Sequence, residues 1–222
     1  MSLRDLAETK RFWIGVFGGL ITVAVGMVLV AVCRQPPVPM PLETVPNARI
    51  ERVYSGHSVK TDQGQKVIYA GIRAPHKDEP LFLDAKGRNT ELVQGRKVRL
   101  RFDQQHLDRK GRLSAYAFVK GQMVNEILVR EGLAYVCLTP STTRFAEMLL
   151  NAQKDARAAK KGLWKRSPRV TETSYPADPK YGNFHRPACQ EVPKIKPERL
   201  LTFAKRSLAL DQGLAPCVKC QP

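Results

Sequence analysis

The pattern of apolar and polar residues between positions 49 and 166 predicts five strands and three helices. Short β-rich runs bounded by turn residues indicate the strands, and glycine after an apolar helical face indicates a helix end. Ser141 or Thr142 is a suitable N-cap for the last helix. The predicted strands are Arg49–Gly56, His57–Thr61, Lys66–Arg73, Val98–Phe102 and Leu113–Val119, and the predicted helices are Leu81–Gln94, Val124–Glu131 and Thr142–Lys160. We therefore expect a mixed α+β domain here.

A long apolar run lies near the N-terminus. Phe12–Cys33 contains 22 residues without a charge, enough to cross a bilayer as one transmembrane helix. A cleaved signal peptide is the alternative, although its apolar region is normally shorter. Arg4, Lys10 and Arg11 precede the run, whereas Arg34 alone follows it closely. This bias predicts a single-pass protein of the bacterial inner membrane, with a cytoplasmic N-terminus and a periplasmic body.

Small residues recur along one face of this predicted helix at positions i, i+4, i+7 and i+11. Such a stripe allows another membrane helix to approach closely, although glycine is also common in membrane helices in general. We predict that this face packs on another membrane-protein subunit or on a second copy of the chain. The stripe consists of Gly15, Gly19, Thr22 and Gly26.

The rest of the chain divides at stretches rich in proline. Residues 1–11 form a short polar segment, and residues 34–48 form a spacer whose prolines favour an extended, stiff chain. Residues 167–182 combine prolines with small polar residues and predict a second linker. Two folded parts are therefore expected, over residues 49–166 and 183–222.

The balance of charge is strongly basic. The 222 residues include 37 lysines and arginines against 20 aspartates and glutamates, a formal net charge of +17. An excess of this size suggests an anionic partner, either nucleic acid bound through a basic surface or an anionic membrane. The excess is also compatible with a role in solubility alone.

A polar turn between two predicted strands carries the first sign of chemistry. The turn is Asp108-Arg-Lys-Gly-Arg112. Its glycine permits a tight change of direction, and Arg112 can present a guanidinium fork suited to phosphate. By itself this pattern is equally typical of a solvated hairpin loop.

Three further motifs accompany this turn in a fixed order. Together the four resemble the staphylococcal nuclease-like, or thermonuclease, family over about Arg49 to Trp164. The resemblance implies a five-stranded OB-fold barrel with helices. The other motifs are Gly-Ile-x-Ala-Pro at Gly71–Pro75, the run Val124–Ala134, and the Ala-Arg…Gly-Leu-Trp ending at Ala156–Trp164.

The resemblance also implies where catalytic groups should lie. Family members that cleave nucleic acid hold one Ca²⁺ mainly with carboxylates. The three corresponding positions carry His57, Arg73 and His76. Ca²⁺ prefers oxygen ligands, which these side chains do not supply. Calcium is therefore not expected, although Asp78 and Glu79 leave a shifted acidic site open, and the two histidines could serve as a Zn²⁺ or Cu²⁺ pair.

Two arginines that neutralise phosphate are also implied by the resemblance. Ile68 occupies the first position, and only the second is retained, as Arg112 with Asp108 ahead of it. Without the first arginine, less positive charge is available to stabilise the transition state. We predict a catalytically degenerate site in which Arg73 and Arg112 form a pocket for an anion or for a carboxylate of a partner.

Four possible metal ligands lie near the C-terminus. His185 and Cys189 are followed by Cys217 and Cys220, an H-x3-C…C-x2-C pattern that predicts a closed, structural zinc site. Residues 183–222 resemble the metal-binding module of the Ada DNA-repair protein, with His185 in place of its first cysteine, and methyl acceptance is not implied. A Cys217–Cys220 disulfide or free thiols are the alternatives.

Three classes of function follow. The first is a membrane-anchored, catalytically degenerate nuclease-like protein that binds an anionic partner. The second is an accessory or scaffold subunit of a membrane complex. The third is an active membrane-anchored endonuclease. The missing ligands favour the first two classes over the third. Tyr69, Tyr116 and Phe118 are the aromatic residues available for stacking on bases, although strand alternation can bury them.

Overall fold

The computed structural model describes residues 47–165 and 172–222. All of them belong to one compact unit, Glu43–Pro222. The predicted polar segment, the transmembrane helix with its small-residue stripe, and the spacer up to residue 46 lie outside the described residues. Within the two described ranges, no helix combines the length and the apolar character that a membrane crossing requires.

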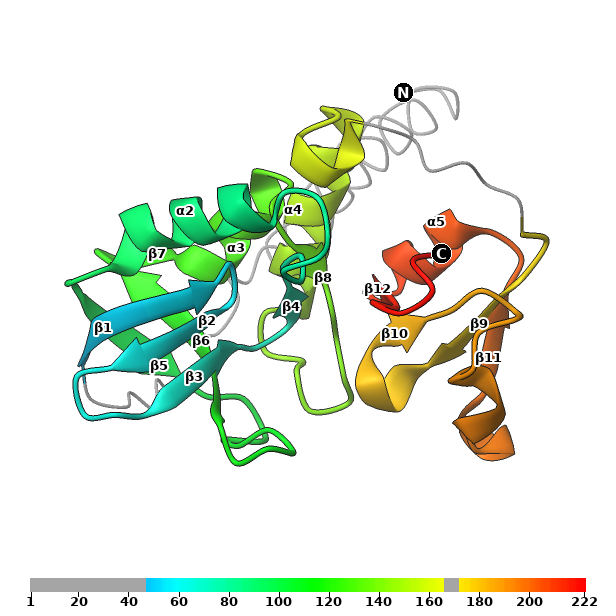
Figure 1. Cartoon of the computed structure of the whole chain (residues 1–222), viewed down its shortest axis with the longest axis horizontal. Coiled ribbons are helices and arrows are strands. Elements are labelled where there is room, and N and C mark those ends of the chain that lie inside the picture. The colour runs from blue at the N-terminus through cyan, green and yellow to red at the C-terminus, as the bar shows by residue number, and fades with distance from the viewer. Residues whose placement is uncertain (1–46, 166–171) are drawn as a thin grey trace, which may run out of the picture. The chain divides into compact units, whose positions relative to one another are not determined.

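Five strands close into the barrel that the sequence predicts (Figure 1). The strand order is β3-β2-β1-β5-β6, and a parallel pair between β3 and β6 closes the ring. The two-residue strand β7, Gln122–Met123, extends the sheet beyond β6. The barrel strands are β1 Ala48–Ser55, β2 Ser58–Thr61, β3 Lys66–Tyr69, β5 Lys97–Arg101 and β6 Leu113–Val119.

The predicted third strand, Lys66–Arg73, is interrupted. It ends as β3 at Tyr69, and Ile72–Arg73 forms a separate strand, β4, which pairs with β8 at Tyr135–Val136. Gly71 turns the chain between them with φ of 72°. A β-carbon on Gly71 would lie only 2.8 Å from the Cδ1 of Leu149, so this turn depends on glycine.

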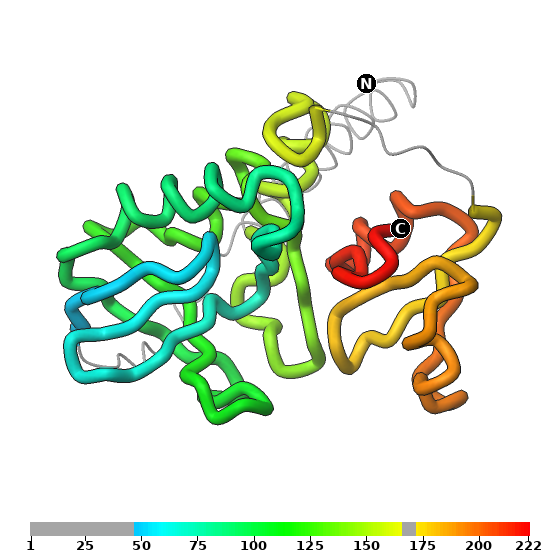
Figure 2. Tube along the Cα trace, viewed as in Figure 1, coloured from blue at the N-terminus to red at the C-terminus, as the bar shows by residue number. Residues whose placement is uncertain are grey.

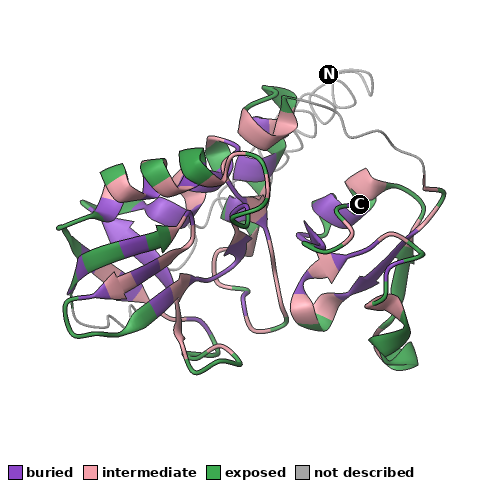
Figure 3. Cartoon of the chain, in the orientation of Figure 1, coloured by how far each residue is buried: buried purple, intermediate pink, exposed green. Residues whose placement is uncertain are grey.

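The barrel interior is filled by the side chains that alternate inward along each strand. Figure 3 shows buried residues gathered on the inner faces and exposed residues on the outer ones. All three aromatic residues considered for stacking on bases are among the buried ones: Tyr69, Tyr116 and Phe118. Tyr69 and Tyr116 bond through their hydroxyl groups to other buried side chains. None of the three is therefore available to stack on bases.

Three helices pack against the barrel (Figure 1): α2 Phe82–Val93, α3 Val124–Arg130 and α4 Ala146–Ala158. The predicted start of the last helix was wrong by four residues, and neither proposed cap is at its N-terminus. The hydroxyl of Thr142 instead accepts the N–H of Thr139 at 2.6 Å and closes a separate turn. A side chain that can cap a helix can equally stabilise such a turn.

The C-terminal part forms a second sheet with its own small core, built on Tyr175, Phe184 and Leu210. Its strand order is β11-β9-β10-β12, with the short helix α5, Arg206–Asp211, alongside. The strands are β9 Tyr175–Asp178, β10 Asn183–Phe184, β11 Leu201–Phe203 and β12 Ala215–Pro216. Strand β9 lies inside the predicted linker 167–182. The structure differs from this expectation, because Pro176 sits in a fully buried strand.

Buried contacts join this C-terminal module, residues 172–222, to the barrel. The side-chain oxygen of Gln153 in α4 accepts the N–H of Val136, and its side-chain nitrogen donates to the carbonyl of Leu210. The N–H of Leu138 donates to the carbonyl of Gly213 at 2.8 Å. The chain trace in Figure 2 shows the segment after β8 running beside the module. Barrel and module therefore share hydrogen bonds as well as apolar contacts.

Candidate functional site

His57 occupies the tight turn between β1 and β2, at the open end of the barrel. Its Nδ1 accepts the backbone N–H of Ala74 at 3.2 Å, so the remaining ring hydrogen of the neutral form lies on Nε2. Burial lowers the pKa of His57 to about 4, and the charges of Arg73 and Arg112 add to this effect. The imidazole is therefore neutral near pH 7.

Arg73, at the end of β4, is largely buried. Its Nη1 lies 3.0 Å from the Oε2 of Glu79, with 15% and 11% of the two side chains exposed. The guanidinium also lies over the ring of Tyr135, 5.1 Å from its centroid. Its Nε and Nη2 are buried without a hydrogen-bond partner. A guanidinium thus stands at a position where the resemblance implies a metal-binding carboxylate.

Both acidic residues of the loop before α2, Asp78 and Glu79, already have polar partners. Glu79 accepts the backbone N–H of His76 at 2.5 Å in addition to its contact with Arg73. Asp78 lies 3.3 Å from the Nδ1 of His76, and both of these side chains are exposed. Among the described residues, no group of three or more metal-binding side chains gathers at this end of the barrel.

Arg112 and Asp108 form a self-contained turn. Asp108 Oδ1 accepts the N–H groups of Lys110 and Arg112, and its Oδ2 accepts the Nε–H of Arg112 at 2.7 Å. Burial opposes ionisation of Asp108, but these hydrogen bonds outweigh it and lower the pKa of the carboxyl group. Arg112 is thus held in place by Asp108, whose carboxylate offsets much of its charge.

The remaining position, Ile68, lies in β3 opposite Ser58 and beside Ser114. Its half-buried apolar side chain offers no donor to a phosphate. The structure brings His57, Arg73 and Arg112 close enough to influence one another electrostatically. The anion pocket predicted between the two arginines stays a prediction, because each arginine already has a carboxylate partner.

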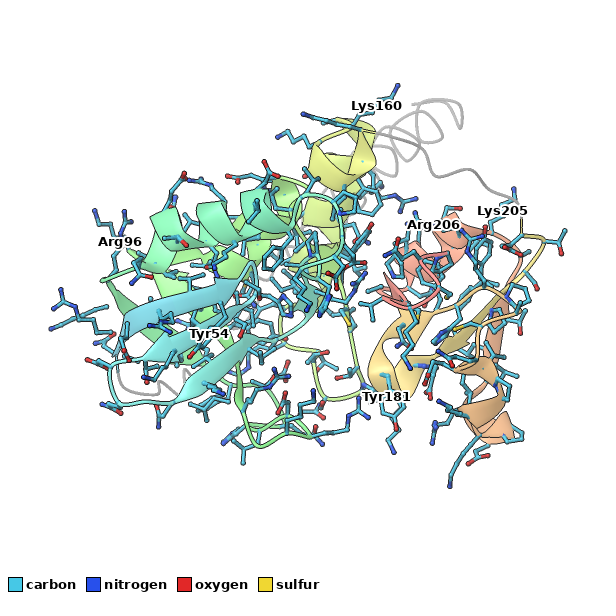
Figure 4. All side chains as sticks on the ribbon, viewed as in Figure 1. Tyr54, Arg96, Lys160, Tyr181, Lys205 and Arg206 are labelled. Atoms are coloured by element: carbon cyan, nitrogen blue, oxygen red, sulfur yellow. The ribbon has the colours of Figure 1, made fainter. Side chains whose placement is uncertain are left out.

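A cavity of about 530 Å³ opens beside this end of the barrel. Glu79 and Tyr135 line one part of it, and Arg206 of the C-terminal module lines another. Arg206 is labelled in Figure 4. Burial lowers the pKa of Arg206, although the neighbouring Tyr135 counteracts this effect. The cavity wall therefore contains residues from both parts of the unit.

The second candidate site is the cluster of His185, Cys189, Cys217 and Cys220. The ligand atoms of these four residues all lie within 4.8 Å of one another. His185 follows β10 and Cys217 follows β12, so the parallel pairing of these strands brings the two halves of the motif together. The four cysteines of the described chain are free thiols. The cluster could bind a metal ion.

The surroundings of the cluster fit a bound cation. The Nδ1 of His185 is buried without a partner, and its Nε2 is 3.2 Å from the side-chain oxygen of Asn183. An oxygen that accepts a hydrogen bond from the other ring nitrogen commonly orients a metal-binding imidazole. The backbone N–H of Arg186 donates to the sulfur of Cys220. Sequence reasoning missed Asn183 and Arg186, since neither is part of a recognisable spacing.

The barrel geometry and these sites define a nuclease-type OB-fold protein with a C-terminal Cys/His cluster. Residues 66–166 match the family described as staphylococcal nuclease homologue. A thermonuclease of Staphylococcus hyicus is 30% identical over 125 residues, which cover 52% of this chain and 74% of the relative. The chain belongs to the staphylococcal nuclease family.

Two relatives from Bacillus subtilis (strain 168) are also similar. Endonuclease YncB is 31% identical over 140 residues, which cover 58% of this chain and 66% of YncB. The SPbeta prophage-derived endonuclease YokF is 34% identical over 99 residues, which cover 44% of this chain and 33% of YokF. The chain thus spans less than two thirds of either protein.

Proposed function

We propose that this chain is a catalytically degenerate member of its family that binds an anionic partner at the membrane, as a binding or accessory subunit. The observation that carries this proposal is the placement of Arg73. Its guanidinium stands where the resemblance implies a metal ligand, and it forms an ion pair with Glu79, the acidic side chain that would be needed to replace that ligand. A fixed positive charge there repels Ca²⁺.

Two further contributions to phosphodiester hydrolysis would also be absent, namely activation of water by a metal ion and stabilisation of charge on the phosphate. Without a bound metal there is no ion to activate water or to polarise the phosphoryl group. Ile68 cannot stabilise charge that builds on the phosphate, and loss of one such donor commonly costs about 3–4 kcal/mol of transition-state stabilisation. The names of the relatives favour the alternative, an active membrane-anchored endonuclease.

A nuclease assay separates these two functions. Purified full-length protein is incubated with DNA and RNA in the presence of Ca²⁺, of Zn²⁺, or of EDTA, beside a thermonuclease as a positive control. We expect no metal-dependent cleavage. In parallel, isothermal titration with Ca²⁺ compares the wild type with H57D/R73D, which restores two carboxylates; only the variant is expected to bind. Metal-dependent cleavage by the wild type would contradict the proposal.

The membrane part of the proposal depends on residues 12–33, and its accessory role on the stripe of small residues. Co-purification from membranes in mild detergent tests both, because a subunit of a complex should bring other membrane proteins with it. We expect Gly19→Leu to reduce the size of the extracted assembly, since a large side chain blocks close helix packing. An unchanged assembly size would exclude the stripe as the contact.

For the C-terminal cluster we propose Zn²⁺ as the resident ion. Three thiolates and one imidazole form a closed set typical of structural zinc. The supporting observation is the unpartnered, buried Nδ1 of His185 beside the sulfur atoms. Elemental analysis of purified protein is expected to find one equivalent of zinc. A folded module without bound metal would contradict this.

A further inference from the structure

A row of basic side chains follows the outer face of β5. Lys97, Arg99 and Arg101 alternate with the buried Val98 and Leu100, so all three project outward. Residues two apart on a strand are spaced by about 6.7 Å. The row therefore places positive groups at regular intervals along one side of the barrel, away from the turn that holds His57.

A hollow of about 320 Å³ lies beside this row. Lys97, Arg99 and Phe118 line it together with Lys120, which comes from the turn between β6 and β7. Lys120 has a φ of 49°, a left-handed conformation that side chains other than glycine rarely adopt. The backbone of the β6–β7 hairpin is therefore strained at Lys120, whose side chain is the fourth cation beside the hollow.

Phe118 organises the two central arginines. The guanidinium carbons of Arg101 and Arg99 lie 4.8 Å and 5.8 Å from the centroid of its ring. Such contacts orient a guanidinium but accept none of its N–H groups. The Nε atoms of both arginines are buried without a hydrogen-bond partner. Their charges are therefore held in place and incompletely solvated.

No carboxylate compensates this charge within the described chain. None of Lys97, Arg99, Arg101 and Lys120 forms an ion pair there. Burial lowers the pKa of Arg101, and the positive charges of Arg99 and Arg144 add to this effect. Most other half-buried arginines do have an acidic partner: Arg73, Arg88, Arg112, Arg157, Arg186 and Arg199. The unpaired cations of the β5 row repel one another, and binding of an anion would relieve this repulsion.

We propose that Lys97, Arg99, Arg101 and Lys120 form a second anion site, which binds the phosphate backbone of a nucleic acid strand. A regular row of cations suits a polymer with an anion on every unit better than a single small ion. Recognition is independent of base sequence, because contacts to phosphate carry no sequence information. The site deepens the proposed function by naming the anionic partner and the surface that receives it.

Binding is measured by fluorescence anisotropy with a labelled phosphorothioate oligonucleotide and full-length protein in mild detergent, without added metal. We expect R99Q/R101Q to lower the affinity by about tenfold, as the loss of charged hydrogen bonds predicts. The slope of log affinity against log salt concentration should fall by about 1.4 for two lost contacts to a single strand. Circular dichroism verifies that the variant is folded.

Three further variants make the result specific. K154Q/K160Q removes the same charge from exposed sites on and after α4 and is expected to retain the affinity; Lys160 is visible at the top of Figure 4. R99K/R101K keeps the charge without the guanidinium fork, so it should keep the salt slope and lose part of the affinity. K120Q, in an exposed turn, should weaken binding even if the double variant does not fold.

Several outcomes overturn the proposal. Unchanged affinity in both R99Q/R101Q and K120Q excludes this surface, and an equal loss in K154Q/K160Q shows that only net charge matters. Binding to phosphatidylglycerol vesicles through Arg99 and Arg101, without oligonucleotide binding, assigns the site to lipid phosphate instead. Cleavage of an ordinary oligonucleotide would contradict catalytic degeneracy but leave this binding result unaffected, so the two failures are distinguishable.

Discussion

The contact between Arg73 and Glu79 determines the character of the barrel site. Replacing Glu79 by Gln removes the charge that balances a largely buried guanidinium, so the free energy of unfolding should fall by roughly 2 kcal/mol. Urea denaturation measures this change. Glu91→Gln is the matched control, because Glu91 pairs with Arg88 at the same 3.0 Å while 68% of its side chain is exposed.

The control should change stability by no more than about 0.5 kcal/mol, since exposed ion pairs contribute little. Equal effects of Glu79→Gln and Glu91→Gln would mean that Arg73 has access to water or to another anion. In that case the surroundings of Arg73 would be more open to solvent than the burial of its Nε and Nη2 atoms indicates.

His57 makes the stability of the protein depend on pH. Its pKa in the folded state is about 4, below the ordinary value of 6.5. Above pH 6.5 the imidazole is neutral in both states, and below that pH only the unfolded chain gains the proton. Stability should therefore fall by up to roughly 3 kcal/mol as the pH drops from 6.5 to 4, with no further loss from this group at lower pH.

His57→Asn tests this expectation, because the amide oxygen can still accept the N–H of Ala74 but cannot be protonated in this range. Urea unfolding at several pH values should show a flatter profile for this variant. His106→Asn removes an exposed imidazole and should keep the steep profile of the wild type. A steep profile in His57→Asn would assign the pH dependence to other groups.

At the scale of elements, glycines with positive φ differ in what surrounds them. Gly182 has φ of 64°, and a β-carbon there would lie 2.4 Å from the carbonyl oxygen of Leu138. Gly95 has φ of 69°, with open space around it. Gly182→Ala should therefore cost about 3 kcal/mol of stability, and Gly95→Ala about 1 kcal/mol, which is the backbone strain alone. Thermal unfolding compares the two variants, and equal losses would contradict crowding at Gly182.

The barrel elements could be predicted from sequence where one pattern dominated. Leu113–Val119 forms β6 with the predicted bounds, because its β-rich run ends at a clear turn. The strand predicted over Lys66–Arg73 contains a break at Gly71, where the distant Leu149 leaves no room for a side chain. Strand β9 was missed because the prolines in and around it are typical of a linker, and only the tertiary pairing with β10 and β11 makes it a strand.

The candidate sites were predictable to different degrees. The spacing of His185, Cys189, Cys217 and Cys220 identifies the Cys/His cluster directly, since metal ligands must converge on one point. The barrel positions could be found only through the order of family motifs. The row beginning at Lys97 could not be found, because alternating basic residues are typical of any strand with a solvated face. The row is notable only because no carboxylate pairs with its cations in the described fold, and the sequence does not reveal which charges are paired.

At the scale of the whole unit, the C-terminal module and the barrel support each other through few contacts. Gln153 connects β8 to α5, Arg157 forms an ion pair with Asp211, and Arg109 stacks on Tyr181, with 3.9 Å between its guanidinium carbon and the ring centroid. Tyr181 marks the edge of the module in Figure 4. The module core itself contains only six fully buried apolar residues, too few to hold four short strands strongly.

Metal removal should therefore unfold the module selectively. A small domain of this kind obtains much of its folding free energy from its ion, whereas the barrel has a separate and larger core. After treatment with a strong chelator, we expect trypsin to cleave quickly within residues 172–222 and slowly within residues 47–165. Cys220→Ala should reproduce this pattern without chelator, and added Zn²⁺ should restore resistance only in the wild type.

Cys137→Ala is the matched control, because this thiol lies outside the cluster and donates only a weak hydrogen bond to the carbonyl of Gly182. It should keep the metal and the protease resistance. Loss of the module should also remove the carbonyl partner of Gln153 and lower barrel stability by about 1–3 kcal/mol. A module that stays protease-resistant without metal would mean that its contacts with the barrel, and not the ion, hold it folded.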